Sequence, residues 1–471
     1  MKKEPKDVRA IFSFITLLLF IFFFALYYFG DGVFTESVSA AAKQERLEEI
    51  KQIEDILMTK WANREVREKL DGIDTRKKVR ELKKYAGADL LTYSIAIKRM
   101  TKSLHDDHLW SEFPIMISQD SISKKSRGSG FEVRGFKEGY FLTQCLFAPY
   151  CQELSFPLRI LRIDGRPMDE WFEKEMVNIG ASTPESRKRK ALDNLRFHLD
   201  DGKNSPPQKI TLQLQNGEER MLKIFWYSGE EKKYPFVEYA QENCVDGMMT
   251  PEKTFVLSVN TFSCTQANGT VDYRDYYKPF FQALDKALAK IDNPDSMLVD
   301  VRKNGGGDDT PSEAIFNLLL DKPTVYYISS FLNKEDEWEK RGGNGEFVMF
   351  PNEKYRSIFK NLPVALLAGG QCMSACSIFV AAVRDNHLAP ILGENVQVGV
   401  GSRKFYTLPS GNQLAVPFWK VWGANGERLE GRIIEVDHEI LPSIEDYRQK
   451  DVDVVLQKAI DFLQKERTAE Q

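Results

Sequence analysis

The chain has 471 residues, with 65 Lys and Arg against 69 Asp and Glu and a formal net charge of −4. This length allows roughly two to four domains with buried cores. Hydrophobic residues make up 42% of the chain and charged residues 28%, which excludes a mostly disordered or collagen-like protein. Because the charges nearly balance, the chain has no global basic field, and we expect no nucleic-acid partner.

The N-terminus carries a long apolar segment. Residues 10–29 are apolar except for Ser13 and Thr16, and a run of about 20 such residues can cross a hydrocarbon core as a helix. Basic residues precede the run and acidic residues follow it, so the positive-inside rule exports the remainder of the chain. We therefore expect residues 1–30 to anchor a single-pass membrane protein whose other parts are periplasmic or extracellular. The alternative is a signal peptide, cleaved near residues 38–40, which would release a secreted form.

The six cysteines are compatible with such an exported protein. They are Cys145, Cys151, Cys244, Cys264, Cys372 and Cys376. An even number outside the cytoplasm permits disulfides, and Cys145 with Cys151 is the simplest local pair. Buried free thiols are the alternative. No Cys-x-x-Cys pair occurs, so we do not expect a structural zinc site.

In the first half of the exported chain, the spacing of apolar residues changes from a helical to a β-strand pattern near residue 125. Apolar residues at helical spacing predict a helical cap over residues 43–115. Residues 125–230 then contain short alternating runs and turn signals, including a hairpin at 210–224, which predict a β-rich module with an exposed edge suited to a peptide strand. The basic run RKRK at residues 187–190 is interpreted as a solvated helix face and not as a binding patch.

Residues 250–466 show a strand–helix alternation. Buried strands are expected at residues 255–259, 297–301 and 364–367, and helices at residues 280–291 and 374–383. This alternation predicts a βαβ core with its site at the carboxyl ends of the strands. The polar, Gly-rich residues 335–345 predict a loop or a lid.

A glycine-rich turn follows the second of these strands. Residues 304–307 read NGGG, and TPSE at residues 310–313 predicts a helix that starts with a capping box and Pro at its first position. A phosphate loop is disfavoured because Gly-Lys-Ser/Thr is absent and Asp308 and Asp309 would repel phosphate. A turn that offers backbone N–H groups to an oxyanion fits better. A merely structural turn is the alternative.

A second candidate element is GGQCMSAC at residues 369–376, between a buried strand and a buried helix. A hydroxyl group at such a junction is exposed at the strand end, and the following N–H points outward with the positive end of the helix dipole. Ser374 is therefore suited to be an acyl-transfer nucleophile. The Gly-x-Ser-x-Gly motif of α/β-hydrolases is absent. A simple helix cap is the alternative role for Ser374.

A serine nucleophile needs a base, and the chain has few histidines. They are His105, His108, His198, His387 and His438. His105 and His108 lie in LHDDH at the end of the helical cap. Their spacing beside two aspartates invites a metal site, but no third ligand motif accompanies them. The other three histidines are compatible with surface positions.

These motifs together resemble the tail-specific (carboxy-terminal processing) peptidase family. The similarity covers about residues 253–464 and extends upstream to residues 104–108; it rests on Asp300, Arg302, Asn304, Gly306, Gly307, Ser374, Ala375, Gly393, Glu394, LPSG at 408–411 and NGERLEG at 425–431. The resemblance implies an α/β fold with a ClpP/crotonase-like ββα core over residues 250–466. The β-rich module, at residues 125–230, resembles the family's PDZ-like insertion, although residues 145–156 replace its small-residue stretch and suggest a steric gate or regulatory segment.

The family has two catalytic designs. In one, a lysine in a Gly-Lys-Gly-like turn activates the serine, but the matching residues 394–401 contain no lysine. The other, similar to the tricorn core and the chlamydial protease-like activity factor, uses a histidine that precedes the β module. The resemblance thus implies a nucleophile, a general base, an orienting acid and an oxyanion hole: Ser374, His108, Glu430, and Gly306 with the N–H of Ala375, respectively. Open alternatives are His105 as the base, Lys404 in a Ser/Lys dyad, and a nucleophilic Cys372 or Cys376.

The chemistry agrees with this assignment. A serine hydroxyl is a weak nucleophile and needs a base with a pKa of about 7, while an acid partner fixes the imidazole and stabilises its protonated form. We therefore predict an exported serine endopeptidase that cleaves unfolded or extended polypeptides and needs no cofactor or metal. The alternative is a non-catalytic peptide- or ligand-binding protein, since the fold also occurs in retinoid-binding proteins of the eye.

Overall fold

The structure is a computed structural model that describes residues 39–118, 126–145, 151, 153–199, 205–228, 243–264, 276–354, 359, 362–449 and 452–470. The apolar residues 10–29, which the sequence predicts to be an anchor, lie outside these ranges. Within the described ranges, no helix combines the length and the apolar character that a membrane span requires.

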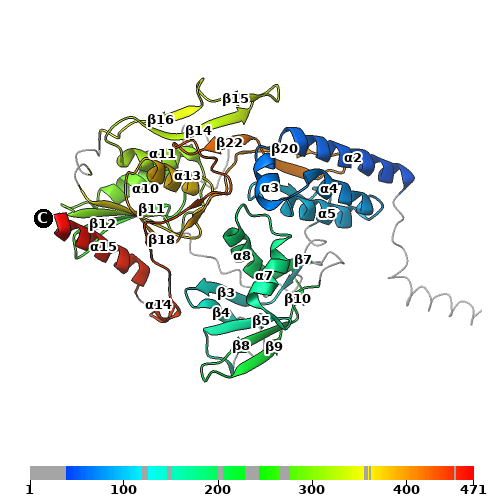
Figure 1. The fold of residues 1–471 in the computed structure, drawn as a ribbon, viewed down its shortest axis with the longest axis horizontal. Helices are drawn as coiled ribbons and strands as arrows, with labels where there is room; N and C mark the ends of the chain where they lie inside the picture. The colour runs from blue at the N-terminus through cyan, green and yellow to red at the C-terminus, as the bar shows by residue number, and fades with distance from the viewer. Residues whose placement is uncertain are drawn as a thin grey trace, which may run out of the picture.

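The N-terminal region is helical and packs on a small sheet (Figure 1). It consists of α2 (Ala40–Thr59), α3 (Arg64–Asp71), α4 (Thr75–Arg80), a 3-10 helix (Glu81–Tyr85) and α5 (Leu90–Lys102). The side chains of Ser39, Asp74 and Asp89 cap three of the helices at their N-termini. Ile53 and Ile97 are among the apolar side chains that form a common core with Leu414. That residue belongs to a three-stranded sheet of β1 (Trp110–Glu112), β21 (Gln413–Pro417) and β20 (Arg403–Thr407).

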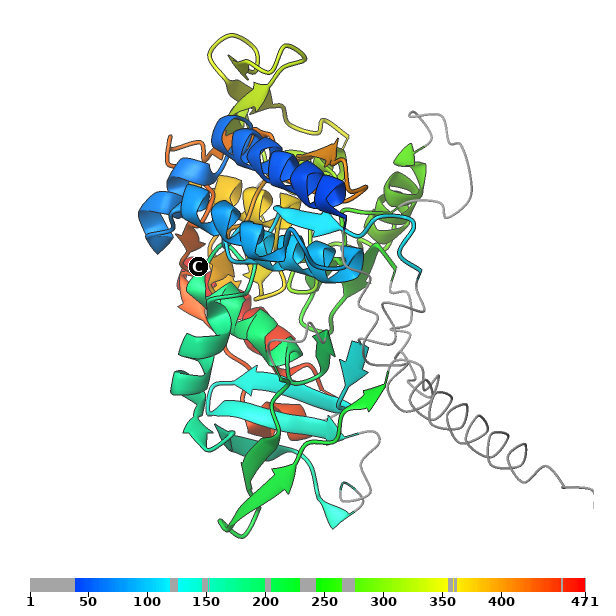
Figure 2. The same cartoon turned by 90° about the vertical axis from the view of Figure 1, so that its right-hand side faces the viewer.

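The β-rich module has a separate core. Its larger sheet has the order β3 (Phe131–Phe136), β4 (Gly139–Cys145), β5 (Leu158–Ile163), β8 (Lys209–Gln213) and β9 (Glu219–Lys223), with β6 (Arg166–Pro167) beside β5; β2 (Ser126–Gly128), β7 (Phe197–Leu199) and β10 (Tyr227–Ser228) form a second sheet. The hairpin expected from Asn216-Gly217 is present as β8 and β9. Figures 1 and 2 show α7 (Met168–Met176) and α8 (Pro184–Asp193) between the larger sheet and the rest of the protein.

The βαβ core is a three-layer arrangement around a six-stranded sheet. The order is β11 (Val245–Met249), β12 (Thr254–Val259), β13 (Ser296–Asp300), β17 (Val364–Ala368), β18 (Ile391–Gly393) and β24 (His438–Glu439), and all pairs after the first are parallel. Alternate strand residues pack on opposite sides, as the pleat requires. One side contacts α10 (Lys278–Leu288), α11 (Asp309–Leu318) and α13 (Ala375–Asp385), and the other contacts α15 (Val454–Glu470).

The remaining elements complete the core. A second sheet contains β14 (Thr324–Leu332), β15 (Trp338–Lys340), β16 (Glu346–Met349) and β22 (Trp419–Trp422), while β19 (Val396–Gln397) pairs with β23 (Ile433–Ile434). The expectation of a loop over residues 335–345 is therefore wrong in part, because β15 continues the sheet as a hairpin with β14. The short helix α14 (Ile444–Arg448) lies against the β-rich module, where Lys137 N donates to Pro442 O at 3.1 Å.

The start of α11 differs from the sequence prediction. The helix begins at Asp309 with Asp308 as its N-cap, and no side chain caps it. Asp308 N donates to Phe262 O, so the glycine turn joins the neighbouring strand end and the helix starts before the expected capping box. Ser312 Oγ instead donates to Asp309 O, inside the first turn. The predicted capping box at residues 310–313 is thus wrong.

All six cysteines are paired. The disulfides are Cys145–Cys151, Cys244–Cys264 and Cys372–Cys376. The first is the local pair that the sequence suggested, and no free thiol remains for the alternative reading. Three disulfides indicate that this part of the chain lies outside the reducing cytoplasm.

Candidate active site

Ser374 lies at the junction between β17 and α13 in an unusual backbone conformation. Its φ is 53° and its ψ is −126°, a combination that costs a non-glycine residue of order 1–3 kcal/mol and is concentrated at functional sites. The hydroxyl group makes no capping hydrogen bond to α13. The alternative role as a simple helix cap is therefore wrong, and the side chain is available for other contacts.

The contact that Ser374 makes instead is with His108. The His108 Nε2 atom lies 3.2 Å from Ser374 Oγ, across 266 positions of sequence. His108 is buried, and this burial lowers the pKa of its imidazole against the opposing effect of Asp106 and Asp107. A lowered pKa leaves the imidazole neutral at pH 7, so Nε2 can accept the hydroxyl proton.

Glu430 is buried close to this pair. Its Oε2 atom accepts a hydrogen bond from Val400 N at 3.0 Å, and its Oε1 atom lies 3.6 Å from Arg67 Nε. Burial, with a further contribution from the charge of Asp106, raises the pKa of Glu430 to about 8. Among the described residues, His108 Nδ1 and Glu430 Oε1 are both buried without a hydrogen-bond partner. The structure thus places Glu430 in the region of His108 without a direct hydrogen bond between the two side chains.

Two aspartates beside His108 hold the loop that carries it. Asp106 Oδ1 accepts the His108 N–H at 2.7 Å, and Asp106 Oδ2 accepts from Trp61 Nε1 at 2.7 Å. Asp107 Oδ1 lies 2.6 Å from Lys190 Nζ, and Asp107 Oδ2 accepts from Ser182 N at 2.8 Å. Lys190 and Ser182 belong to the β-rich module, so that module contacts the His108 loop directly.

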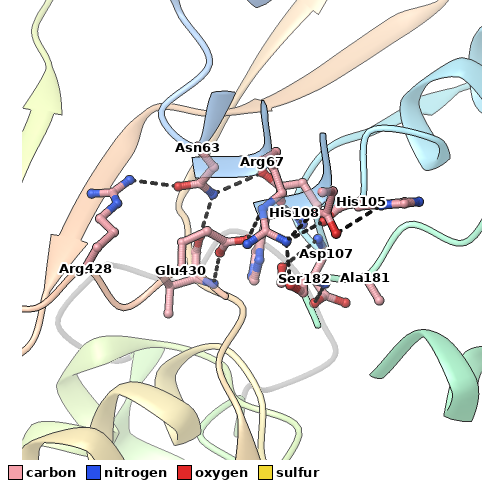
Figure 3. A network of polar contacts seen from close by, with 12 residues as sticks. Asn63, Arg67, His105, Asp107, His108, Ala181, Ser182, Arg428 and Glu430 are labelled. Atoms are coloured by element: carbon pink, nitrogen blue, oxygen red, sulfur yellow. Dashed lines mark hydrogen bonds and ion pairs between the residues drawn. The ribbon is translucent and has the colours of Figure 1, made fainter. Parts of the chain in front are cut away.

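Figure 3 shows the wider network around this loop. Arg67 of α3 is fully buried, and its guanidinium group donates to the carbonyl oxygens of His105 and Ser182 and pairs with Asp71. Arg187 of α8 also pairs with Asp71, at 2.9 Å. The helical cap, the His108 loop and the β-rich module are therefore joined by buried charges.

The interpretation of residues 187–190 as a solvated helix face is therefore wrong. Arg187 is buried and Lys190 binds Asp107. Burial also lowers the pKa of Arg187 and of Arg189, and the latter faces Gly370 and Glu394 at the Ser374 turn. A basic run does not distinguish a solvated face from one that packs on buried acids in another part of the chain. Partners at this distance could not be identified from the sequence.

The residues expected to form an oxyanion hole lie beside Ser374. Ala375 is the first residue of α13, so its N–H has no acceptor within the helix. Gly306 has a φ of 98°, and a Cβ atom on it would lie only 2.8 Å from Ser374 Cβ, so glycine is required there. The Gly306 N–H donates to Asn304 Oδ1 at 2.8 Å. In this arrangement the Ala375 N–H is free to face an oxyanion, whereas the Gly306 N–H is already bonded within its own turn.

The alternative bases lie elsewhere. His105 Nδ1 is 3.4 Å from Asp71 Oδ1, and His105 Nε2 is 3.3 Å from Val177 O. The Lys404 Nζ atom pairs with Asp336 Oδ1 at 3.0 Å. These polar contacts direct His105 and Lys404 to other groups, so the structure brings His108, and not these two residues, to the serine.

Two further alternatives also fail. Cys372 and Cys376 are bonded to each other, which removes the thiol that a cysteine nucleophile would need. The described residues contain no cluster of His, Cys, Asp or Glu side chains arranged to hold a metal ion. The remaining histidines lie apart from the serine: His198 packs near Trp226, His438 packs against Phe462, and His387 follows α13.

A cavity of about 410 Å³ is lined mainly by residues of β14, β15 and β22 and of the turns beside them, and neither Ser374 nor His108 is part of its wall. Its wall includes Asp309, which follows the glycine turn, and Ser402, which follows a glycine whose added Cβ would lie 3.6 Å from His108 Cβ. The other lining residues are Phe331, Glu339, Lys340, Arg341, Gly342, Phe418 and Trp419. Burial raises the pKa of Asp309 to about 6. The cavity therefore combines aromatic surface with titratable charge.

Solved structures with a similar fold are known. The solved structure of mature CPAF complexed with lactacystin has a TM-score of 0.65 at 13% identity, over 91% of this chain and 98% of that one. The structure of mature CPAF alone has a TM-score of 0.65 at 13% identity, over 91% of this chain and 97% of that one. The photosystem II D1 C-terminal processing protease has a TM-score of 0.43 at 14% identity, over 85% of this chain and 93% of that one. No curated protein sequence matches the chain. The likeness to CPAF shows a common fold.

Residues 257–440 match the family description "Peptidase family S41". This match covers the glycine turn, the Ser374 junction and Glu430. This part of the chain therefore matches the S41 serine peptidases, a family of peptide hydrolases, and the resemblance to tail-specific peptidases is confirmed over these residues.

Proposed function

We propose that the protein is a serine endopeptidase that cleaves unfolded or extended polypeptides through an acyl-enzyme, with Ser374 as nucleophile and His108 as general base and acid. The single observation that carries this proposal is the 3.2 Å contact between His108 Nε2 and Ser374 Oγ. It is supported by the backbone of Ser374, which holds the hydroxyl away from the helix that it precedes.

In the proposed reaction, His108 Nε2 takes the Ser374 proton while Oγ attacks the scissile carbonyl carbon. The protonated imidazole then gives that proton to the leaving amine, and water repeats the sequence to release the acyl group. The Ala375 N–H, at the positive end of α13, would stabilise the oxyanion. The Gly306 turn would be the second donor only if its N–H leaves Asn304, which donates through Nδ2 to Val259 O and so has a fixed position.

Glu430 is proposed to stabilise the imidazolium electrostatically. Its carboxylate is buried, so its charge acts through a low effective dielectric. A raised pKa of about 8 makes Glu430 largely neutral at pH 7, and the carboxylate form dominates only above about pH 8. This proposed role is therefore strongest in mildly alkaline solution.

The proposed setting is outside the cytoplasm, with the N-terminal segment as a membrane anchor. The three disulfides support export, and the apolar residues 10–29 support the anchor. The β-rich module is proposed to be a PDZ-like unit that adjusts access or activity, because its Lys190 and Ser182 contact the His108 loop.

The test is proteolysis of an unfolded protein such as reduced casein by the purified protein and by Ser374→Ala. We expect complete loss of cleavage and of labelling by a fluorophosphonate probe in the variant, with an unchanged circular dichroism spectrum. Cleavage by a well-folded Ser374→Ala protein would reject the proposed nucleophile. Absence of cleavage and labelling in the folded wild-type protein would favour the ligand-binding alternative.

A further inference from the structure

The Cys372–Cys376 disulfide encloses the candidate nucleophile. It closes a loop with a sequence separation of four residues, and Ser374 is at its centre. Both cysteines are completely buried in the core cluster beneath the serine. The serine thus occupies the top of a small covalent ring whose sulfur atoms lie on the core side.

The same disulfide touches the base of the glycine turn. Cys376 Sγ lies 3.9 Å from Val301 O, and this carbonyl group also accepts the N–H of Asn304, at 3.0 Å. Asn304 in turn binds the Gly306 N–H. One covalent bridge therefore contacts both turns that surround the serine: the turn at residues 369–376, which carries Ser374, and the base of the glycine turn at residues 304–307.

The conformation of Ser374 needs such support. A non-glycine residue with positive φ tends to relax unless its surroundings hold it. Noncovalent bonds hold its backbone at both ends: Ser374 N donates to Gly399 O at 3.2 Å, and Ser374 O accepts from Ile378 N at 3.1 Å and from Ser377 Oγ at 2.8 Å. The disulfide adds a covalent restraint, because it joins the residues on both sides of Ser374.

The three disulfides differ in what they can contribute. A bridge restricts the unfolded chain less when its loop is shorter, and the separations are 4, 6 and 20 residues for Cys372–Cys376, Cys145–Cys151 and Cys244–Cys264. The bridge around Ser374 is therefore expected to contribute least to global stability through chain entropy. Its location suggests a local role.

We propose that the Cys372–Cys376 disulfide is a positioning element that holds Ser374 Oγ toward His108 and the Ala375 N–H toward the oxyanion. The inference rests on the proposed function and adds a requirement to it: the peptidase reaches full activity only after this bridge has formed. Both sulfur atoms are buried, so the bridge acts by positioning Ser374 and Ala375.

The test compares two double variants of the full chain. Cys372→Ala/Cys376→Ala removes the bridge around the serine, and Cys145→Ala/Cys151→Ala removes a short bridge in the β-rich module as the matched control. For the first we expect kcat on a peptide substrate to fall about 10- to 100-fold, because small errors of alignment have effects of this size, with KM within about threefold. The control should show a comparable fall in Tm with a clearly smaller fall in kcat, which separates the local effect on Ser374 from the general loss of a short bridge. Wild-type kcat in folded Cys372→Ala/Cys376→Ala overturns the proposal.

A second measurement applies if that variant does not fold. The wild-type protein is treated with rising concentrations of a dithiol, which transfers two electrons and two protons to each disulfide and becomes a disulfide itself. Alkylation and mass spectrometry then give the reduced fraction of each bridge. Activity should follow the intact fraction of Cys372–Cys376; constant activity as that bridge opens overturns the proposal. A fully active Ser374→Ala would instead refute the proposed function, whatever the bridge does.

Discussion

The two sides of the candidate active site are held in different ways. The Ser374 side is apolar and covalent: α13 is buried from Ala375 to Val383, and the disulfide closes its first turn. The His108 side is built from charges, with Asp106 and Asp107 bound to groups from the helical cap and the β-rich module. The candidate nucleophile thus depends on core packing, and the candidate base depends on polar contacts between separate parts of the chain.

This difference indicates where activity can be adjusted. Apolar packing and a disulfide leave little freedom short of unfolding. Buried charges are sensitive to the loss of one partner, because the other is left uncompensated. A displacement of the β-rich module would move Lys190 and Ser182 away from Asp107. It would therefore change the position of His108 more than that of Ser374. The predictions below test this division, beginning with the largest expected effect.

The largest effect should come from the base itself. We expect His108→Ala to lower kcat/KM by at least about ten-thousandfold, as loss of the catalytic histidine does in other serine peptidases. Lys404→Ala is the control, because this lysine pairs with Asp336 and not with Ser374, and it should stay within about threefold of wild type. Steady-state proteolysis measures both. The reverse ranking would transfer the role of base to Lys404.

Next in size is a change of packing on the serine side. Phe379 of α13 is fully buried and packs against Phe262 and Phe316, at ring distances of 6.2 and 6.5 Å. We expect Phe379→Ala to reduce the free energy of unfolding by about 3–5 kcal/mol, measured by urea denaturation. The protein that remains folded should keep kcat within about threefold, because the disulfide still holds the Ser374 turn. A large loss of kcat in that protein would show that packing alone places the serine.

Glu430→Gln should have an intermediate effect with a characteristic pH dependence. Burial raises the pKa of Glu430 to about 8, so the wild-type kcat should rise between pH 7 and pH 9 as the carboxylate forms. The variant should lack this rise and have a kcat about 10- to 100-fold lower at pH 9. Both proteins should lose kcat/KM in acid, because protonation of His108 removes the base. The lowered pKa of His108 places this loss below pH 6.5. An alkaline rise that persists in Glu430→Gln would contradict the proposed role.

The sequence predicted the serine side better than the histidine side. Long apolar runs identified the strands on both sides of residues 369–376, and the local motif located Ser374 at the junction. The aspartates that hold His108 were not identified, because their partners lie far away in sequence: Asp107 meets Lys190 across 83 positions and Asp106 meets Trp61 across 45. The disulfide around Ser374 was also missed, since spacing alone does not separate a bonded pair from two buried thiols.

The smallest predicted effect concerns the contact between the β-rich module and the base. In Lys190→Met, Asp107 keeps its hydrogen bonds to Ser182 but loses its ion pair, so the charge of its buried carboxylate is less well compensated. We expect kcat to fall about tenfold with little change in KM, since a small displacement of His108 affects the reaction more than substrate binding. Lys190→Arg keeps the charge and should restore most of the activity.

The matched control for that contact is Arg162→Met, which breaks the exposed pair between Arg162 and Glu219 in the same module, at 2.6 Å. Exposed ion pairs contribute about 0–1 kcal/mol, so activity should not change. Equal losses in Lys190→Met and Arg162→Met would mean that the module as a whole is destabilised. A loss confined to Lys190→Met, rescued by Lys190→Arg, would show that one ion pair transmits the position of the β-rich module to the catalytic histidine.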